Sequence, residues 1–397
     1  MEGRRYFCAA MKTRILLTAL LLVSCTGLES SQDRRGSGTG PAAPETPAAR
    51  DTTIYFSLVE YSGGYSWRTD FEVPETPPTV TLYKNFEPVL TLEACDKSEI
   101  SADFDSHIIR GGHLYTKFAG HGRTVVKRDG NTLFSYEGEE SIEDFLFRGD
   151  TLYTLGRKIG SEGFSLRRDG EPVFTSEEGS FYGSLHCDDG HICFPFHRTV
   201  GTDSFDFIVR DDACVQVAPL GGTTTLDIRM FEGTIHKLYL TGSGEVWLQT
   251  GDTARKVCDA SDGWGTPTDA SLCVLPDGIG VLYEQMSGTQ GSATLWREGS
   301  IIHRDVTDSA YLYPDGPGMV CYNGSCVLVC WSAEGGANIK SGTWYFFSRN
   351  CAALCEGVYY MALTPRADFS RPSICVGNAE TEIESDGVLT SIEVICS

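Results

Sequence analysis

Six side chains could together bind a polyhydroxylated ligand if the fold brings their loops to one surface. Three are carboxylates, one is a guanidinium group and two are aromatic rings. Aromatic rings can stack on the faces of sugars, and a pair of carboxylates can act as general acid and base in glycoside cleavage. An acidic protein also exposes acidic loops that bind nothing, so these residues are candidates only. The six are Glu143, Tyr182, Asp227, Arg229, Trp264 and Asp269.

A second possible site is a metal-binding loop between His186 and His191, where Cys187 and two aspartates also lie. The segment holds only two imidazoles, and its Asp189-Gly190 pair matches turns found elsewhere in the chain. The sequence therefore predicts a hairpin here, with no metal and no cofactor. Motifs of serine hydrolases, zinc peptidases, phosphate-binding loops and calcium-binding loops are absent from the sequence. The sequence thus leaves catalysis uncertain and favours a function without it.

A repeated pattern defines the elements that must position these residues. A strand-forming stretch is followed by a basic residue, then Asp or Asn, often Gly, and then a second strand-forming stretch, as in FSLRRDGEPVF at 164–174 and VVKRDGNTLF at 125–134. Asp or Asn before Gly adopts positive φ at little cost, so the pattern is typical of hairpin turns. The basic position recurs every 40 to 52 residues, at Lys84, Arg128, Arg168, Arg210, Thr250 (a degenerate copy), Arg297 and Arg349.

Repeats of this length, each with two such hairpins, are the sequence signature of a β-propeller. One four-stranded blade cannot bury both of its faces, whereas neighbouring blades in a closed ring can. The sequence therefore predicts an all-β fold, a propeller of seven four-stranded blades, with six or eight blades as alternatives. Two β-sandwiches with similar hairpins are a further alternative.

The blade number depends on how the ring closes. The first repeat lacks an obvious innermost strand, and the stretch Val358–Pro365 could supply it. Closing a blade with strands from both ends of the chain leaves no free edge. However, IESDGVLTSIEV at 383–394 resembles an eighth repeat.

The N-terminal segment has the pattern of an export signal. Lys12 and Arg14 precede an apolar run at 15–23, and Ser24 is followed by Cys25. The run is too short to span a bilayer. A cysteine directly after a small residue makes the segment similar to the lipobox of bacterial lipoproteins. An ordinary signal peptide, or a buried apolar helix, is the alternative.

The sequence predicts three parts. Residues 1–24 are expected to be the signal peptide, with Met11 as the true start and 1–10 as an over-extended gene start. Residues 25–51 are rich in Ser, Gly, Pro and Ala, which predicts a disordered tether. Residues 52–397 form the predicted propeller domain.

The lipobox, tether and repeats together resemble the exported β-propeller lipoproteins of gut-type Gram-negative bacteria. The resemblance implies cleavage between Ser24 and Cys25 and a diacylglyceryl thioether on the Cys25 sulfur, which would anchor the protein to a membrane. It favours the outer membrane, because Thr26 carries no charge that would retain the protein in the inner one. The resemblance concerns architecture only, so it assigns no binding or catalytic residue in this sequence.

The net charge limits the classes of partner that the protein could bind, and the cysteine positions suggest a disulfide. The net charge of −22 argues against nucleic acid and against adhesion of the folded body to anionic lipid. Among 15 cysteines, Cys321 and Cys326 flank Asn323-Gly324, a strong signal for a two-residue turn. Such a turn would place the two cysteines opposite each other, so the sequence predicts a disulfide between them.

The leading functional hypothesis is a membrane-anchored binding or scaffold module for a polysaccharide or a partner protein. The first alternative is a carbohydrate-active enzyme, either a polysaccharide lyase or a glycoside hydrolase, with its site in the axial funnel of the propeller. The second is a structural subunit of an envelope complex. The sequence leaves open the oligomeric state and the membrane face on which the protein is displayed.

Overall fold

The protein is described by a computed structural model that divides into two compact units, Met1–Ala49 and Arg50–Ser397. All described residues belong to the second unit. The predicted signal peptide, Cys25 and the predicted tether lie outside the described residues. These are residues 52–396 except 61–78, 94–106, 121, 183–184, 201–202, 218–220, 276–277, 288–289, 308–309, 317–318, 325–326, 333, 342–344, 347–348, 366–370 and 386.

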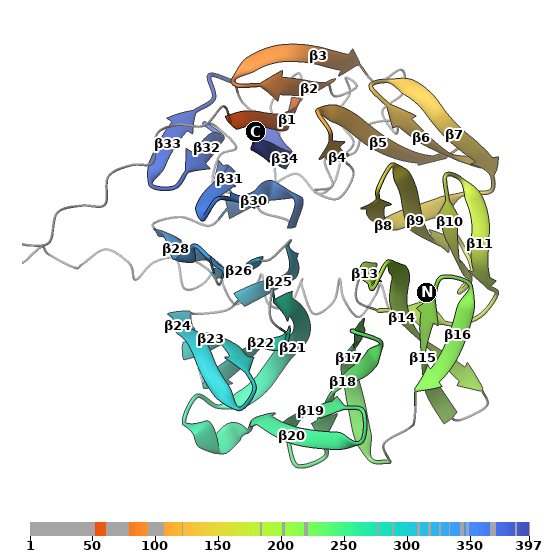
Figure 1. The fold of residues 1–397 in the computed structure, drawn as a ribbon, viewed down its shortest axis with the longest axis vertical. Coiled ribbons are helices and arrows are strands. Elements are labelled where there is room, and N and C mark those ends of the chain that lie inside the picture. The colour runs from red at the N-terminus through yellow and green to blue at the C-terminus, as the bar shows by residue number, and fades with distance from the viewer. Residues whose placement is uncertain are drawn as a thin grey trace, which may run out of the picture. The chain divides into compact units, whose positions relative to one another are not determined.

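The described residues form eight antiparallel sheets, which follow one another around a ring in chain order (Figure 1). Each sheet is one blade, numbered here from 1 to 8. The all-β propeller is thus confirmed, with eight blades instead of the favoured seven. In the described ranges no helix is long and apolar enough to cross a membrane, and the helical segments are the short turns η1 (Ala260–Asp262) and η2 (Arg349–Cys351).

The strand bounds of the first four blades are as follows. Blade 1 contains β34 (Val388–Cys396), β1 (Thr52–Glu60), β2 (Thr79–Lys84) and β3 (Glu87–Glu93). Blade 2 contains β4 (His107–Arg110), β5 (His113–Gly120), β6 (Arg123–Arg128) and β7 (Asn131–Glu137). Blade 3 contains β8 (Glu140–Arg148), β9 (Thr151–Lys158), β10 (Phe164–Arg168) and β11 (Glu171–Ser176). Blade 4 contains β12 (Ser180–Phe181), β13 (His186–Asp188), β14 (His191–Val200), β15 (Asp203–Arg210) and β16 (Ala213–Val217).

The remaining blades continue the same order. Blade 5 contains β17 (Thr223–Phe231), β18 (Thr234–Thr241), β19 (Val246–Thr250) and β20 (Thr253–Cys258). Blade 6 contains β21 (Thr266–Leu275), β22 (Gly278–Ser287), β23 (Gln290–Arg297) and β24 (Ser300–Thr307). Blade 7 contains β25 (Ala310–Gly316), β26 (Met319–Gly324), β27 (Val327–Ser332) and β28 (Gly336–Ser341). Blade 8 contains β29 (Tyr345–Phe346), β30 (Ala352–Cys355), β31 (Val358–Pro365), β32 (Ser373–Val376) and β33 (Ala379–Glu382).

Six of the seven predicted repeat positions mark the outer turn of a blade, and the seventh does not. Lys84, Arg128, Arg168, Arg210, Thr250 and Arg297 each end the third strand of a blade, just before its outermost strand. Arg349 instead begins η2, ahead of β30, so it marks no outer turn. The stretch Val358–Pro365 is β31, the second strand of an additional blade, and does not close the ring.

The ring closes in blade 1, where β34 pairs with β1 as its innermost strand. The stretch at 383–394 is therefore largely a closing strand and not an eighth repeat. Closure by both ends of the chain was expected, but through a different strand. The Ser57 hydroxyl shares hydrogen bonds of 2.8 Å with the hydroxyls of Thr390 and Ser391. A disulfide between Cys355 of β30 and Cys396 of β34 adds a covalent link from blade 8 to this strand.

In blades 1 to 4 the repeated Asp or Asn fastens the outer hairpin to the second strand of the same blade. The backbone N–H of Asp129 donates to the carbonyl of Leu114 at 2.8 Å, and its side-chain Oδ1 accepts the N–H of Leu114 at 2.9 Å. Asp129 and Gly130 have φ of 51° and 79°, as a type I′ turn requires. The same pair of bonds joins Asp169 to Leu152, Asp211 to Ile192 and Asn85 to Ile54. The motif is thus structural, as the turn chemistry predicted.

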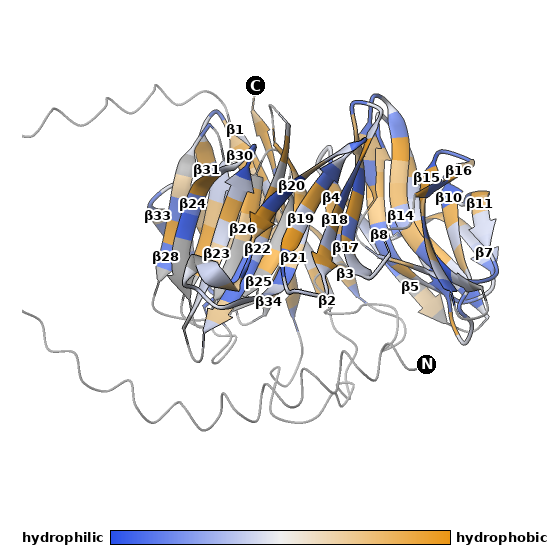
Figure 2. Cartoon of the chain, turned by 90° about the horizontal axis from the view of Figure 1, so that it is seen from below, coloured by the Kyte–Doolittle hydropathy of each residue, from blue (hydrophilic) through white to orange (hydrophobic). Residues whose placement is uncertain are grey.

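The hydrophobic core lies between the blades. Among the described residues, seven clusters of buried apolar side chains bridge neighbouring blades, and the largest of these joins blades 7, 8 and 1 across the closure. Figure 2 shows hydrophobic and hydrophilic positions alternating along many strands, as expected where a sheet packs against its neighbours. Phe164 illustrates this packing, because the fully buried ring of this blade 3 residue contacts the rings of Phe194 and Phe196 in blade 4.

Carboxylates at the boundary between sheets also join successive blades. Glu393 of β34 accepts hydrogen bonds of 2.8 Å from the backbone N–H groups of Gly111 and Gly112, in the inner hairpin turn of blade 2. In blade 4, Asp188 does the same for the turn of blade 5, at Glu232 and Gly233. A carboxylate that accepts two backbone N–H groups satisfies donors that would otherwise be unpaired between the sheets.

The second disulfide differs from the predicted one. Cys321 of β26 lies opposite Cys330 of β27 with the Cα atoms 4.1 Å apart, and the two sulfurs are bonded. The hairpin register pairs Asn323 with Leu328, so Asn323 and Gly324 belong to the strand and do not form the turn. Cys326 lies outside the described residues. The prediction of a Cys321–Cys326 bridge is therefore replaced by Cys321–Cys330.

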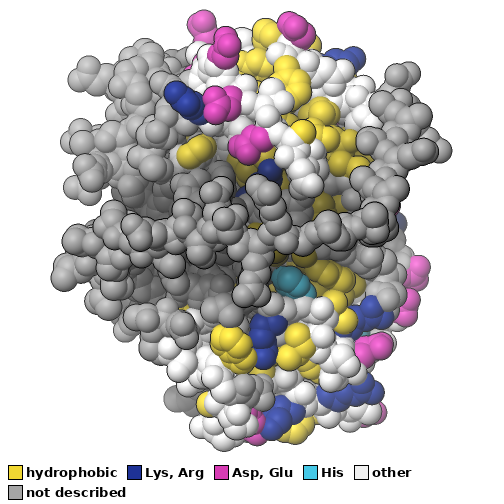
Figure 3. Space-filling view, turned by 90° about the vertical axis from the view of Figure 1, so that its left-hand side faces the viewer, with side chains coloured by type: hydrophobic (Ala, Val, Ile, Leu, Met, Phe, Trp, Pro, Cys, Tyr) yellow, Lys and Arg dark blue, Asp and Glu magenta, His cyan; other side chains and the backbone are white. Residues whose placement is uncertain are grey.

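The outermost strands expose some apolar side chains. Ile301 and Ile302 of β24 and Ile339 of β28 are 41 to 54% exposed. On the face shown in Figure 3, apolar side chains reach the surface among acidic and basic side chains. Singly exposed apolar residues are normal on protein surfaces.

Candidate functional site

A cleft of about 430 Å³ lies between blades 4 and 5. Its walls come from β14 and β15 of blade 4 and from β17 and β18 of blade 5. Its volume lies in the lower part of the range of small-molecule sites, about 300 to 1,000 Å³. Four hydroxyls, two rings, one ion pair and one leucine line it: Ser204, Thr223, Thr224, Thr225, Tyr182, His197, Asp206, Lys237 and Leu226.

The Asp206 carboxylate is the centre of the polar contacts in this cleft. Its Oδ1 accepts a hydrogen bond from the Tyr182 hydroxyl at 3.2 Å. Its Oδ2 accepts the Thr225 hydroxyl at 2.6 Å and the Lys237 ammonium group at 2.9 Å. The donors come from blades 4 and 5, so this carboxylate holds the two walls of the cleft together.

The ion pair at the cleft floor is well shielded from water. The side chain of Lys237 is 3% exposed and that of Asp206 is 16% exposed. Such a pair is retained where its charges are mutually satisfied, because a single buried charge would be costly. Removal of either partner would therefore destabilise the wall as well as change the site.

Tyr182 is held as a hydrogen-bond donor. Burial raises the pKa of its hydroxyl because the phenolate form would lose hydration, and the Asp206 carboxylate raises the pKa further by repelling that form and accepting the proton. Tyr182 therefore stays protonated at neutral pH and cannot act as a general base. Its ring lies 5.8 Å from that of His197, tilted by 33°, which gives the cleft one aromatic wall.

A second hollow of about 360 Å³ lies between blades 3 and 4, and His197 lines both hollows. The β9–β10 loop contributes Glu162, and the loop that leads into β12 contributes Glu178 and Gly179. The close approach of this loop requires glycine, because a Cβ on Gly179 would lie 2.6 Å from the carbonyl oxygen of His197, and φ there is +110°. Ser180 and Thr199 complete the lining.

The six predicted residues are not brought together by the fold. Tyr182 lines the cleft, as described. Asp227 and Arg229 are each 4% exposed and lie in β17, where blade 5 packs against blade 6. Asp227 accepts the backbone N–H groups of Ile228 at 2.8 Å and Leu272 at 2.9 Å, and its Oδ2 lies 3.6 Å from Arg229 Nε. Their burial and contacts give them a structural role between blades.

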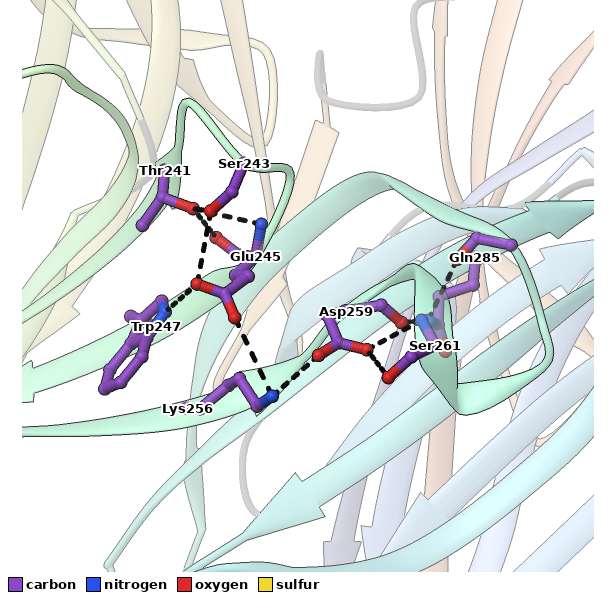
Figure 4. A network of polar contacts seen from close by, with 9 residues as sticks. Thr241, Ser243, Glu245, Trp247, Lys256, Asp259, Ser261 and Gln285 are labelled. Atoms are coloured by element: carbon purple, nitrogen blue, oxygen red, sulfur yellow. Dashed lines mark hydrogen bonds and ion pairs between the residues drawn. The ribbon is translucent and has the colours of Figure 1, made fainter.

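Trp264 lies in the loop that leads into blade 6, half-buried beneath Arg304, whose guanidinium lies 5.5 Å from the ring centroid. A polar network fixes the start of this loop (Figure 4). Lys256 bridges the carboxylates of Glu245 at 3.7 Å and Asp259 at 2.6 Å, and Asp259 also accepts the N–H and the hydroxyl of Ser261.

The same network sets the ionisation of Asp259. Hydrogen bonds from Lys256 and Ser261 lower its pKa from 3.8 to about 2. The Gln285 side-chain amide donates to the backbone carbonyl of Asp259 at 2.9 Å and to that of Gly265 at 3.2 Å, so it braces both ends of the loop. Trp264 thus lies in a loop that is braced at both ends, and it is not among the residues that line the cleft.

Glu143 and Asp269 lie at irregularities in innermost strands. The pairing of β8 with β9 shifts between Ile142 and Asp144, which leaves Glu143 as the extra residue of a bulge. A similar shift between Pro267 and Asp269 precedes the exposed Asp269 in β21. Neither residue lines the two hollows.

The two histidines of the possible metal loop have separate partners. The Nε2 atom of His186 accepts the backbone N–H of Met230 at 3.2 Å. The Nδ1 atom of His191 lies 2.6 Å from an oxygen of Asp211. Among the described residues, no group of three or more His, Cys, Asp or Glu side chains is arranged to hold a metal ion.

Four functional candidates of the cleft were missed by the sequence analysis: Asp206, Lys237, Thr225 and His197. They lie within strands, whereas the predictions concerned loops. One signal was present, because Asp206 in FDFIVR and Lys237 in TIHKLYL are charges within otherwise apolar strands. A charge in such a position must be paired if it is buried.

Comparisons with known proteins add structural neighbours and no family. No family model matches the chain, and no curated protein sequence matches it. The crystal structure of Citrobacter koseri AztD is 10% identical, with a TM-score of 0.48 over 87% of this chain and 98% of that one. The structure of apo AztD from the same organism is 10% identical, with a TM-score of 0.48 over 86% of this chain and 98% of that one. The β-propeller domain of Myceliophteria thermophila Cps50 (Swd1) is 12% identical, with a TM-score of 0.39 over 63% of this chain and 90% of that one.

Proposed function

We propose that the protein is a lipid-anchored envelope protein whose propeller binds a glycan in the cleft between blades 4 and 5. The single observation that carries the glycan assignment is the lining of this cleft. Hydroxyls and a carboxylate acceptor surround the Tyr182 and His197 rings, with the charge of Asp206 balanced by Lys237. Sugars present many hydroxyls on a partly apolar ring, which such a lining complements.

The anchoring part of the proposal is supported by the sequence. The lipobox-like Ser24-Cys25 junction and the polar segment that follows fit a lipidated cysteine on a tether. The outer membrane is the proposed location, on either face.

The site chemistry supports binding more than catalysis. Asp206 is the only carboxylate among the described residues that line the cleft, and its oxygens already accept three side-chain donors. Glycoside hydrolysis generally needs two carboxyl groups that flank the scissile bond. Tyr182 remains protonated, so it cannot abstract a proton from a uronate as a lyase base would.

The test is a glycan-array screen of the mature protein in detergent, followed by titration calorimetry with each polysaccharide that binds. Thr224→Val removes an exposed hydroxyl from the cleft, and Thr132→Val makes the same change on the outer strand β7. The cleft variant should lose about fivefold in affinity, as for one hydrogen bond, while the β7 variant should bind normally. Equal affinities would exclude this cleft as the site.

The same protein and polysaccharides distinguish a binding module from an enzyme and from a structural subunit. After incubation with a bound polysaccharide, product of unchanged length supports a binding module, whereas shortened product would indicate an enzyme. An array without any bound glycan would refute the glycan assignment and favour a protein partner or a structural role in an envelope complex.

A further inference from the structure

We infer that the two hollows on either side of His197 are consecutive subsites for one oligosaccharide chain, so that the ligand is a polymer segment and not a single sugar. This inference rests on the proposed function and names the ligand class more closely. The first subsite is the cleft between blades 4 and 5. The second is the hollow between blades 3 and 4.

The two hollows occupy equivalent places in successive blades. The first is formed by the end of the β14–β15 hairpin, where Ser204 lies, and by the start of β17 at Thr223. The second is formed by the β9–β10 loop at Glu162 and by the segment that leads into β12 at Ser180. Each hollow thus lies between the middle hairpin of one blade and the innermost strand of the next. Repetition of the blade gives repetition of the hollow.

The wall between the hollows is thin and polar. His197 borders both, and its neighbour Thr199 borders the second. The Thr199 hydroxyl lies 3.2 Å from the hydroxyl of Ser204, which lines the first hollow. A chain of sugar rings that crosses from one hollow to the other would therefore meet an imidazole and two hydroxyls at the crossing.

The second subsite differs from the first in charge. Its exposed carboxylates, Glu162 and Glu178, have no cation among the described residues that line this hollow. These carboxylates can accept sugar hydroxyls and would repel the carboxylates of a uronate. The groove therefore fits neutral or amino sugars and disfavours acidic polysaccharides.

The experiment uses the mature protein in detergent and oligosaccharides of one to six units, size-fractionated from the polysaccharide that binds in the array. Calorimetry should show affinity rising at least tenfold from one unit to two or three, with little gain beyond. Equal affinity for one and three units would overturn the two-subsite inference and leave the proposed function intact. Failure of every polysaccharide to bind would refute the proposed function and the inference with it.

A matched pair of variants locates the second subsite. Glu178 lines the hollow, whereas its neighbour Glu177 points to Lys158, with 2.8 Å between the charged atoms. Glu178→Ala should reduce severalfold the gain in affinity between oligosaccharides of one and three sugar units, and Glu177→Ala should preserve that gain. Thr224→Val, in the first hollow, should instead weaken oligosaccharides of all lengths by the same factor. Equal effects of the two glutamate variants would overturn the placement of the second subsite.

Discussion

Replacement of Cys396 by serine would remove the covalent link between blade 8 and the strand that closes the ring. Cys355 and Cys396 are 41 residues apart in sequence. In the chain-entropy model, cross-linking a loop of that length stabilises the folded state by about 4 kcal/mol. With a melting entropy of about 2.1 cal/mol/K per residue over the unit Arg50–Ser397, this corresponds to a fall in Tm of roughly 5 °C.

The assay is thermal unfolding followed by circular dichroism under non-reducing conditions. Cys214→Ser is the control, because Cys214 is an exposed free cysteine on the outer strand β16 and should leave Tm unchanged. Reduction of the unmodified protein should lower Tm by at least as much as Cys396→Ser, since it also opens Cys321–Cys330. The reasoning is refuted if Cys396→Ser melts within 1 °C of the unmodified protein, or if non-reducing peptide mapping finds Cys396 as a free thiol.

Three further predictions concern the wall between blades, the loop before blade 6 and the anchor. Asp227→Ala should lower the free energy of unfolding in urea by about 3 kcal/mol, because the N–H of Leu272 loses its acceptor within a buried ion-pair site; an unchanged midpoint would contradict this. The lowered pKa of Asp259 stabilises its loop above pH 3.8, and this contribution is lost as the pH falls from 3.8 to about 2. The fluorescence of Trp264, obtained by difference from the Trp264→Phe variant, should change over that range, and Asp259→Asn should abolish the change. Cys25→Ala should release the protein from membranes, and a variant that still sediments with membrane would refute lipidation at this position.

The architecture could be predicted because its turns have a chemical requirement that is visible in the sequence. Asp129 and its counterparts combine positive φ with a side-chain acceptor, which few residue types can provide. The blade count failed where that signature is missing. The outer turns of blades 7 and 8 lie after Ser332 and Val376, with no basic residue before them. Arg349-Asn350 reproduces the letters of the motif but lies in η2, ahead of the innermost strands of blade 8, and forms no outer turn, so one blade was overlooked.

The candidate site was less predictable because its residues are brought together across blades. Asp206 and Lys237 belong to different sheets, and their contact depends on how the blades pack, which no local pattern encodes. Asp227 showed the opposite error. It was chosen as a carboxylate in a loop, but the pairing of β17 with β18 makes it part of a strand, and its oxygens serve backbone donors. The sequence thus identified Asp227 as a residue with polar contacts, but it did not show that these contacts join strands and do not bind a ligand.

The pairing of β1 with β34 also constrains the order in which the molecule can fold. Blades 2 to 8 each consist of strands that follow one another directly in sequence, so they can form from local contacts. Blade 1 needs a contact such as that between Ser57 and Ser391, 334 residues apart, and contacts of such separation form slowly. Blade 1 is therefore expected to be completed last, and until then the edge of β1 stays open to pairing with other chains. This interval is when the folding chain would be most prone to aggregation and most dependent on chaperones.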